Sequence, residues 1–210
     1  MKTVRLLISI FTASAVLGAC REGTPTSESL RSTLEASVCN GKILFGQQDA
    51  LLYGHSWRAS ENDSLDRSDI ESVCGKHPAV LGLDLGGIES GSDRNLDGNA
   101  FSLMRTAALR QYERGGIVTL SWHPENPLTG GDSWDVSSGN TVASILKGGE
   151  NHEKFISWLS LCADYLDTFL DKKGKRIPMI FRPWHEHTGN WFWWGGDLCS
   201  AEEYKELWML

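Results

Sequence analysis

The sequence predicts an α/β fold in which parallel strands alternate with helices. Short apolar runs alternate along the chain with segments in which apolar residues recur at helical spacing. Proline and glycine residues bound several of the apolar runs, and polar or aromatic clusters follow their carboxyl ends. An alternation of this kind is typical of parallel strands that are joined by helical crossovers.

Each predicted element depends on a local pattern. Four apolar runs are predicted to be strands, and they occupy residues 42–46, 79–84, 116–122 and 177–182. Helical spacing predicts one helix that carries Phe101, Met104, Ala108 and Tyr112, and another that carries Phe155, Leu159, Cys162, Leu166 and Phe169. A short helix is predicted over 68–74, and a last one begins with a capping box formed by Ser200 and Glu203.

The clusters at the carboxyl ends of the strands favour a TIM-type (β/α)8 barrel. They are Gln47–Asp49, Asp84–Gly87, His123–Pro127 and His185–His187. The active sites of such barrels lie at the carboxyl ends of the strands. A doubly wound sheet would instead place a G-x-G-x-x-G turn after an early strand, and the sequence has none. Four βα units are half of an eight-fold barrel, so we expect the domain to continue beyond residue 210.

The N-terminal residues are predicted to be a targeting segment rather than part of the fold. Residues 1–19 combine a basic start with an apolar run over 6–17 and end in small residues, as secretory signal peptides do. The stretch Leu17-Gly18-Ala19-Cys20 resembles the lipobox of bacterial lipoproteins, so we expect lipid on Cys20; plain secretion with a chance cysteine is the alternative. Residues 20–38 are predicted to be a flexible tether and residues 39–210 the domain. We therefore expect the protein to be exported and anchored by lipid to the bacterial cell envelope, at the outer membrane.

Charge and cysteine spacing exclude several classes of function. The formal net charge of −7 argues against nucleic acid as a partner, because that partner requires a basic face. The four cysteines after Cys20 allow three disulfide pairings, and none of their spacings predicts a zinc site. Cys162 lies on the apolar stripe of a predicted helix, which favours simple packing. We expect neither a metal nor a cofactor.

Tryptophan is the unusual residue in the composition. The chain has nine, and four of them lie within the eleven positions from Trp184 to Trp194. Sugar rings stack on flat aromatic faces at a surface, and a core does not require this density. Glu186 lies among these rings, and apolar surroundings raise the pKa of a carboxyl, as a general acid at neutral pH requires. Cleavage of a glycosidic bond needs such an acid together with a second carboxylate.

This segment has two alternative interpretations. His185 and His187 are two apart and could bind a metal, but H-E-H is not the helical H-E-x-x-H pattern and no third ligand is evident. Glu186 could also be a rim carboxylate beside a packed aromatic cluster.

The segment Arg182–Gly195, R-P-W-H-E-H-T-G-N-W-F-W-W-G, closely resembles the acid/base motif of glycoside hydrolase family 26. The best-known members of that family are bacterial endo-β-1,4-mannanases. Two supporting stretches, residues 122–127 and 78–89, resemble the motifs that follow strands three and two of the family. The similarity covers nearly all of residues 40–210, so the chain resembles the N-terminal portion of such an enzyme.

The resemblance implies a (β/α)8 barrel and a retaining cleavage of β-1,4-mannan, with Glu186 as the general acid/base. It implies that His123, His185 and Trp191 contact the sugar at the point of cleavage, and that Trp122 and Asn126 help to shape that subsite. In the family the nucleophile is a second Glu after strand seven, which lies beyond residue 210, so we expect the 210-residue chain to be inactive.

Several assignments stay open at this stage. Asp84 is interpreted as structural. Arg182 either orients carboxylates or packs inside the barrel. Trp193 and Trp194 form either a surface for sugar stacking or a wall of the cleft. Alternative functions are a related β-glucanase or xylanase, and a glycan-binding surface lipoprotein without catalytic activity.

Overall fold

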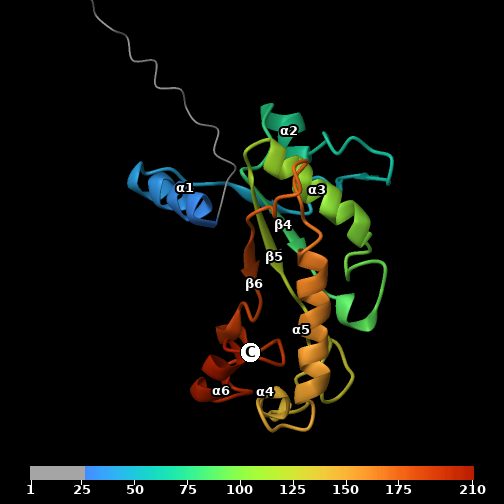
Figure 1. Ribbon diagram of the computed structural model, residues 1–210, viewed down its shortest axis with the longest axis vertical. Helices are drawn as coiled ribbons and strands as arrows, with labels where there is room; N and C mark the ends of the chain where they lie inside the picture. Colours follow the sequence, from blue (N-terminus) through green and yellow to red (C-terminus); the bar gives the residue numbers. More distant parts are fainter. Residues whose placement is uncertain (1–26) are drawn as a thin grey trace, which may run out of the picture.

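The computed structural model describes residues 27–210 (Figure 1). The predicted signal peptide over 1–19 and the predicted lipid on Cys20 lie outside these described residues, as does the first part of the predicted tether. None of the helices in the described part of the chain has the length and hydropathy needed to cross a membrane.

The centre of the fold is a four-stranded parallel sheet in the order β1-β4-β5-β6. Its strands are β1 (Gly46–Gln48), β4 (Val80–Asp84), β5 (Ile117–Ser121) and β6 (Ile180–Arg182). All three pairings are parallel, so the predicted strand order and direction are confirmed. A separate hairpin joins β2 (Tyr53–Gly54) to β3 (Trp57–Arg58).

The first strand begins later than its apolar run predicts. The prediction of a strand over 42–46 is wrong, because β1 spans Gly46–Gln48 and the side chains of Ile43 and Phe45 are exposed. The ladder ends where the N–H of Val80 donates to the carbonyl of Phe45. The next donor along β4 would be the nitrogen of Pro78, which carries no hydrogen.

Helices cover one side of the sheet. Helices α3 (Phe101–Glu113) and α5 (His152–Leu166) lie on the same side of the strands in Figure 1. The core contains Leu83 and Leu120 of the strands together with Met104 and Phe155 of these helices, all of them at most 1% exposed. The other face of the sheet is mixed: it carries Gln48, Thr119 and Arg182 together with Val80, Ile117 and Ile180, as the register and the alternation of side chains along a strand require.

The predicted helix ends agree with the structure. Helix α2 (Asp69–Cys74) is capped by Ser68 and ends at Gly75, which has a left-handed φ of 71°. Helix α6 (Ala201–Leu207) begins with the predicted capping box, in which the backbone N–H of Glu203 donates to the Ser200 hydroxyl and the Ser200 N–H donates to the Glu203 carboxylate. Two short 3-10 helices, η1 (Ile88–Ser90) and η2 (His187–Gly189), follow β4 and β6.

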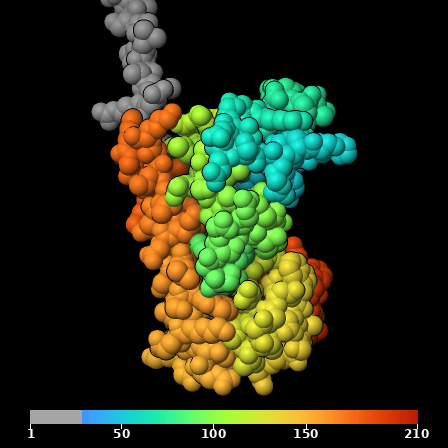
Figure 2. Space-filling view, turned by 90° about the vertical axis from the view of Figure 1, so that its right-hand side faces the viewer, coloured from blue at the N-terminus to red at the C-terminus, as the bar shows by residue number. Residues whose placement is uncertain are grey.

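The long connection after β5 is more ordered than its composition suggests. It contains α4 (Thr141–Ile145), whose Val142 and Ile145 are completely buried. In Figure 2 this connection (yellow) forms a compact mass beside α5 (orange) at the lower end of the molecule. Figure 1 shows that β6 points toward the same end.

The described part of the predicted tether is helical. Helix α1 (Ser27–Cys39) lies apart from the sheet in Figure 1, and most of its described side chains are exposed. Arg31 and Glu35 form an ion pair one turn apart, with 2.8 Å between the guanidinium nitrogen and the carboxylate, which favours the helix. Whether residues 20–38 act as a spacer stays a prediction.

The four cysteines in the described part of the chain are free thiols. Cys162 is 2% exposed on α5, which confirms its predicted packing role. Burial raises the pKa of this thiol, so the reactive thiolate form is disfavoured there.

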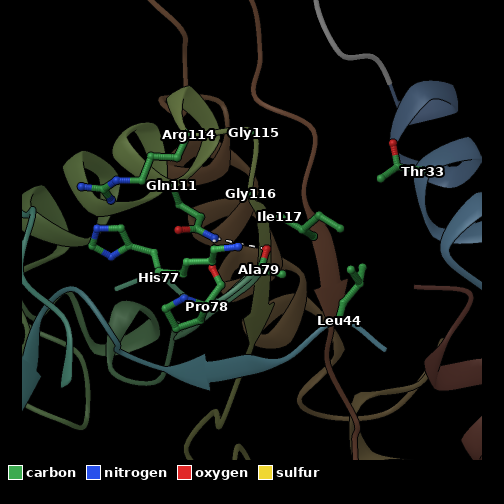
Figure 3. A pocket seen from close by; sticks show the side chains of 11 residues that line it. Thr33, Leu44, His77, Pro78, Ala79, Gln111, Arg114, Gly115, Gly116 and Ile117 are labelled. Carbon is green, nitrogen blue, oxygen red and sulfur yellow. Dashed lines mark hydrogen bonds between the residues drawn. The ribbon is translucent and has the colours of Figure 1, made fainter. Parts of the chain in front are cut away.

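A cavity of about 490 Å³ lies at the amino-terminal ends of β4 and β5, and Figure 3 shows the side chains that line it. Gln111 lies in it and donates through its side-chain amide to the carbonyls of Pro78 and Ala79, and Thr33 of α1 lies on the opposite side. Active sites of parallel α/β barrels lie at the carboxyl ends of the strands. This cavity is therefore at the wrong end of the sheet for the chemistry that the sequence predicts.

Asp49, directly after β1, generates a prediction about stability and pH. Its side chain is completely buried, and burial together with the charges of Asp97 and Asp84 raises its pKa to about 7. The folded protein therefore holds a proton that the unfolded chain releases. The stability contributed by this proton is fully present below the unfolded pKa and is lost as the pH rises toward about 7.

We expect Asp49→Asn to raise the free energy of unfolding at about pH 8 and to change it little at about pH 4. Asn cannot ionise, and it tolerates the left-handed φ of 51° found at this position. Urea denaturation at both pH values measures the effect. Asp164→Asn, on the exposed side of α5, is the control and should show no such dependence; equal effects of Asp49→Asn at both pH values would contradict the prediction.

Candidate active site

The carboxyl ends of β4, β5 and β6 bring together three polar side chains that are far apart in the sequence. Asp84 is the last residue of β4, His123 follows β5 and His185 follows β6. The parallel registers Asp84↔Ser121 and Ser121↔Arg182 align these three strand ends at one edge of the sheet. The convergence predicted from the polar clusters is therefore present in the structure.

A chain of hydrogen bonds joins these residues. The Asp84 carboxylate lies 2.6 Å from Nδ1 of His123, and Nε2 of His123 lies 3.0 Å from Nε2 of His185. The two imidazole rings meet edge to face, with centroids 4.5 Å apart. Asp84 also accepts hydrogen bonds from the Ser121 hydroxyl at 2.5 Å and the Gly86 N–H at 2.8 Å.

The protonation of this chain follows from its contacts. Burial alone raises the pKa of Asp84, but the hydrogen bond and charge of His123, with the Ser121 and Gly86 donors, bring it below its usual value. Burial, followed by the charges of His123 and Arg182, lowers the pKa of His185. The ionised Asp84 accepts a hydrogen bond from the Nδ1–H of His123.

Glu186 lies at the surface beside this chain. Its carboxylate is exposed and accepts a hydrogen bond from the indole N–H of Trp191 at 2.9 Å. Trp191 is itself 48% exposed. The two residues thus present a carboxylate and an aromatic ring side by side at the carboxyl end of β6.

The predicted enclosure of Glu186 by four tryptophans is not found among the described residues. Trp184 is 3% exposed, and Trp193 and Trp194 are completely buried in the core. The indole of Trp193 donates to the carbonyl of Pro124 at 3.1 Å, and that of Trp194 to the carbonyl of His185 at 2.8 Å. These three rings therefore support the site from below, and neither a sugar-stacking surface nor a cleft wall is formed by Trp193 and Trp194.

The backbone around Glu186 has an unusual conformation. Trp184, Glu186 and Asn190 have φ values of 50°, 55° and 59°. A left-handed conformation at a residue other than glycine costs about 1–3 kcal/mol, and such residues cluster at functional sites. These left-handed residues place Glu186 at the surface, because a regular extended continuation of β6 would take the chain in a different direction.

Trp122 and Asn126, which are predicted to help shape the subsite, are both buried. Trp122 is completely buried against Phe155 and Trp184, and its indole donates to the Glu89 carboxylate at 3.0 Å. A ligand at the surface cannot reach its ring. Trp122 is thus part of the core beneath the site.

Asn126 is also completely buried and holds the long connection together. Its amide donates to the carbonyl of Asp135 at 2.9 Å, and its side-chain oxygen accepts from the N–H groups of Leu128 and Thr129. These bonds use both the amide and the side-chain oxygen of Asn126, so Asn126 shapes the site through the loop.

Trp134 is a site residue that the sequence analysis missed. It lies in the long connection, is 49% exposed and stacks on His123 with ring centroids 5.4 Å apart and planes 8° apart. A cavity of about 290 Å³ beside it is lined by Glu89, Arg94, Leu96, His123, Trp134 and their neighbours. The available signal was a single tryptophan within a loop rich in Gly, Ser and Asp after a strand.

Glu89 has a structural role at this site. It is 6% exposed, and its carboxylate accepts hydrogen bonds from the indole of Trp122 and the backbone N–H groups of Glu125 and Gly87. Burial raises the pKa of this carboxyl, and the three donors oppose that shift. Glu89 therefore ties η1 to the start of the long connection.

Arg182 and His187 take separate positions. The side chain of Arg182 is exposed on the face of β6 opposite the core, and its positive charge contributes to the lowered pKa of His185. The ring of His187 packs against Tyr204 of α6, with centroids 3.7 Å apart. Within residues 27–210, no group of three or more His, Cys, Asp or Glu side chains is arranged to hold a metal ion.

Comparison with known proteins identifies the family. Residues 24–210 match the sequence profile of glycosyl hydrolase family 26. A mannan endo-1,4-β-mannosidase of Bifidobacterium adolescentis is 34% identical over 99% of this chain and 22% of its own length. A mannan endo-1,4-β-mannosidase of Bacillus subtilis is 27% identical over 98% of this chain and 58% of its own length.

Comparison with solved structures leads to the same family. A family 26 β-mannanase from Bacteroides ovatus superposes with a TM-score of 0.81 and 48% identity, over 88% of this chain and 53% of that one. A modular endo-β-1,4-mannanase from Cellulomonas fimi gives a TM-score of 0.75 and 34% identity, over 87% and 40%. The chain thus spans about half the length of these relatives or less, and its sheet and helices are a portion of their TIM-type (β/α)8 barrel. On its sequence and its fold, this chain belongs to glycosyl hydrolase family 26.

Proposed function

We propose that this chain supplies the acid/base half of a retaining endo-β-1,4-mannanase. The observation that carries the proposal is the exposed carboxylate of Glu186, held by Trp191 beside the two hydrogen-bonded histidines at the carboxyl ends of the strands. The names of the relatives from Bifidobacterium adolescentis and Bacillus subtilis, both mannan endo-1,4-β-mannosidases, support mannan as the substrate class.

In this mechanism Glu186 first acts as an acid. It gives its proton to the glycosidic oxygen while a second carboxylate attacks the anomeric carbon, so that the glycosidic bond breaks and a glycosyl–enzyme ester forms. The leaving sugar departs with a hydroxyl group. Glu186, now ionised, then removes a proton from water, which attacks the anomeric carbon and releases the second sugar and the carboxylate.

The surroundings of Glu186 hold its side chain in place. The carboxylate accepts a hydrogen bond from the Trp191 N–H at 2.9 Å, which fixes its direction at the carboxyl end of β6. The partly exposed rings of Trp191 and Trp134 offer aromatic surface on which sugar rings can stack.

The second carboxylate is proposed to come from the part of the barrel that the four βα units do not include. The carboxylate of Glu186 accepts a hydrogen bond from Trp191, and among the described residues it contacts no other carboxylate. A retaining mechanism requires the two groups about 5–5.5 Å apart.

Two other functions remain candidates for the test. The same geometry suits a related β-glucan or xylan as substrate, because the hydrogen-bond chain does not by itself select a sugar. A glycan-binding surface protein without catalysis would use the same aromatic faces and would not need Glu186.

Glu186→Gln in the full-length protein is expected to lower kcat/KM on mannan about 10²–10⁴-fold, the usual contribution of general acid–base catalysis. Glutamine keeps the size of the side chain and cannot give or take the proton. Reducing-sugar release from a panel of mannan, β-glucan and xylan measures the effect and the substrate. Glu202→Gln, on the exposed side of α6, is the control. Activity of Glu186→Gln close to wild type would sink the acid/base assignment, and binding without hydrolysis by the wild type would favour the glycan-binding alternative.

Residues 27–210, purified alone, are expected to release no reducing sugar from mannan. Glu186 has no attacking partner there, so its proton has no bond cleavage to assist. The assay is run beside circular dichroism to establish the folded state. Clear turnover by this segment, lost in Glu186→Gln, would show that a carboxylate within it serves as the nucleophile.

We also propose that the protein is exported and held at the bacterial outer membrane by lipid on Cys20, since residues 17–20 resemble a lipobox. Cells grown with labelled fatty acid should transfer label to the wild-type protein but not to Cys20→Ser. Cys39→Ser, which removes an exposed cysteine of α1, is the matched control and should still be labelled. Equal labelling of the wild type and Cys20→Ser contradicts the anchor.

A further inference from the structure

We infer that Tyr204 is a positioning residue for Glu186, because its hydroxyl holds the backbone turn that aims the acid/base carboxylate. The turn consists of residues 184–187 and is called the acid/base turn below. The inference rests on the proposed role of Glu186, and it adds a residue of α6 that no sequence pattern assigns to the site.

The acid/base turn needs external support. Two of its four residues, Trp184 and Glu186, have left-handed φ values, and neither is a glycine. A backbone of this kind persists only where the surrounding structure determines it. The contacts of the turn therefore decide where the carboxylate of Glu186 lies.

Each of the four carbonyl groups of the turn accepts a hydrogen bond. Two donors are backbone N–H groups that follow in sequence: Gly189 bonds the carbonyl of Glu186 at 2.9 Å, and Gly196 bonds that of His187 at 2.8 Å. The other two donors are side chains: Trp194 bonds the carbonyl of His185 at 2.8 Å, and the Tyr204 hydroxyl bonds that of Trp184 at 2.6 Å.

Tyr204 differs from the other donors because it comes from a separate element. Its helix, α6, is fixed by its own capping box and by the buried side chain of Leu207. The ring of Tyr204 also packs against His187, with centroids 3.7 Å apart and planes 34° apart. Tyr204 thus contacts the turn on both sides of Glu186, at the carbonyl of residue 184 and at the side chain of residue 187.

The position of the Glu186 carboxylate decides whether it can act as a general acid. A general acid must lie within hydrogen-bond reach of the atom that it protonates. Without the hydroxyl, the carbonyl of Trp184 loses its partner and the left-handed turn loses one of its four constraints. We expect the carboxylate of Glu186 to sample positions away from the Trp191 indole.

Tyr204→Phe is the variant that tests this, because it removes the hydroxyl and keeps the ring against His187. Tyr165→Phe is the matched control. The Tyr165 hydroxyl also donates to a backbone carbonyl, that of Phe101 at 2.7 Å, but it links α5 to the start of α3. A general loss of stability affects both variants, whereas a loss of positioning affects Tyr204→Phe alone.

The first readout is spectroscopic and does not depend on activity. The indole N–H of Trp191 donates to a carboxylate, and such charge-assisted bonds are stronger than neutral ones and shift the proton resonance downfield. Trp191→Phe assigns the resonance, and Glu186→Gln gives its position without the charge. In Tyr204→Phe the resonance should move toward the Glu186→Gln position; in Tyr165→Phe it should stay. Spectra are recorded at a temperature at which thermal melts show both variants folded, and exchange of the Gly189 N–H serves as a second local measurement.

The second readout is kinetic, in the full-length protein. We expect Tyr204→Phe to lower kcat on mannan about 10- to 100-fold with little change in KM, because misplacement of a reacting group by about 1 Å has effects of this order. An activated aryl mannoside should lose less in the first step, since its leaving group needs no proton.

The outcomes separate the two proposals. Absence of glycan hydrolysis by the wild type refutes the proposed function, and the indole resonance alone then decides the role of Tyr204. An indole resonance, a Gly189 exchange rate and a kcat that match those of Tyr165→Phe would falsify the positioning role, whatever the stability of the variants.

Discussion

The parallel register of β4, β5 and β6 is the constraint on which the rest of the site depends. Because Asp84, Ser121 and Arg182 are paired across the three strands, the residues that follow each strand emerge at the same edge. Asp84, His123 and His185 are 39 and 62 residues apart along the chain, yet they form one line of hydrogen bonds. A shift of one residue in either pairing would move every side chain to the opposite face and break this line.

Below that line, the aromatic residues act mainly as a scaffold. Trp122, Trp184, Trp193 and Trp194 pack with Phe155 into the core, and the indole groups of three of them donate hydrogen bonds to acceptors that lie directly under the site. A buried indole must find such an acceptor, so these rings fix loop backbone as well as filling space. Among the residues that the structure describes, Trp134 and Trp191 are the tryptophans at this site that are about half exposed, so the site has a buried aromatic base and two partly exposed rings.

The acid/base turn and the helix that follows it form a single unit. The turn holds strained backbone, and its four carbonyl groups are each bonded to a donor from a different position of the chain. The capping box that begins α6 thus has a consequence beyond the helix, since it fixes the element from which Tyr204 reaches back. The contacts that order α6 also hold the turn that directs the Glu186 side chain, so the stability of the helix and the proposed role of Glu186 depend on the same residues.

The sequence by itself determined the class of fold, the order and direction of the strands, the boundaries of α2 and the start of α6. These features depend on local periodicity, on caps and on the residues that end a strand, all of which are visible within a few positions of the chain. It also singled out Glu186, His123, His185 and Trp191, because the R-P-W-H-E motif and the strand-end positions are local. The local sequence does not show where β1 begins. That start depends on Pro78, which precedes the neighbouring strand β4 and has no N–H to donate to β1.

Only the tertiary structure decided which aromatic residues are buried in the core and which are exposed at the candidate active site. The eleven positions from Trp184 to Trp194 have neither a helical nor a strand period, because left-handed residues interrupt them, so burial could not be read from spacing. For the same reason the sequence does not show that Trp122 and Asn126 are completely buried, or that Trp134 is half exposed and stacks on His123. The exposure of a side chain is set by what packs on it from distant parts of the chain, and that information exists only once the strands are aligned.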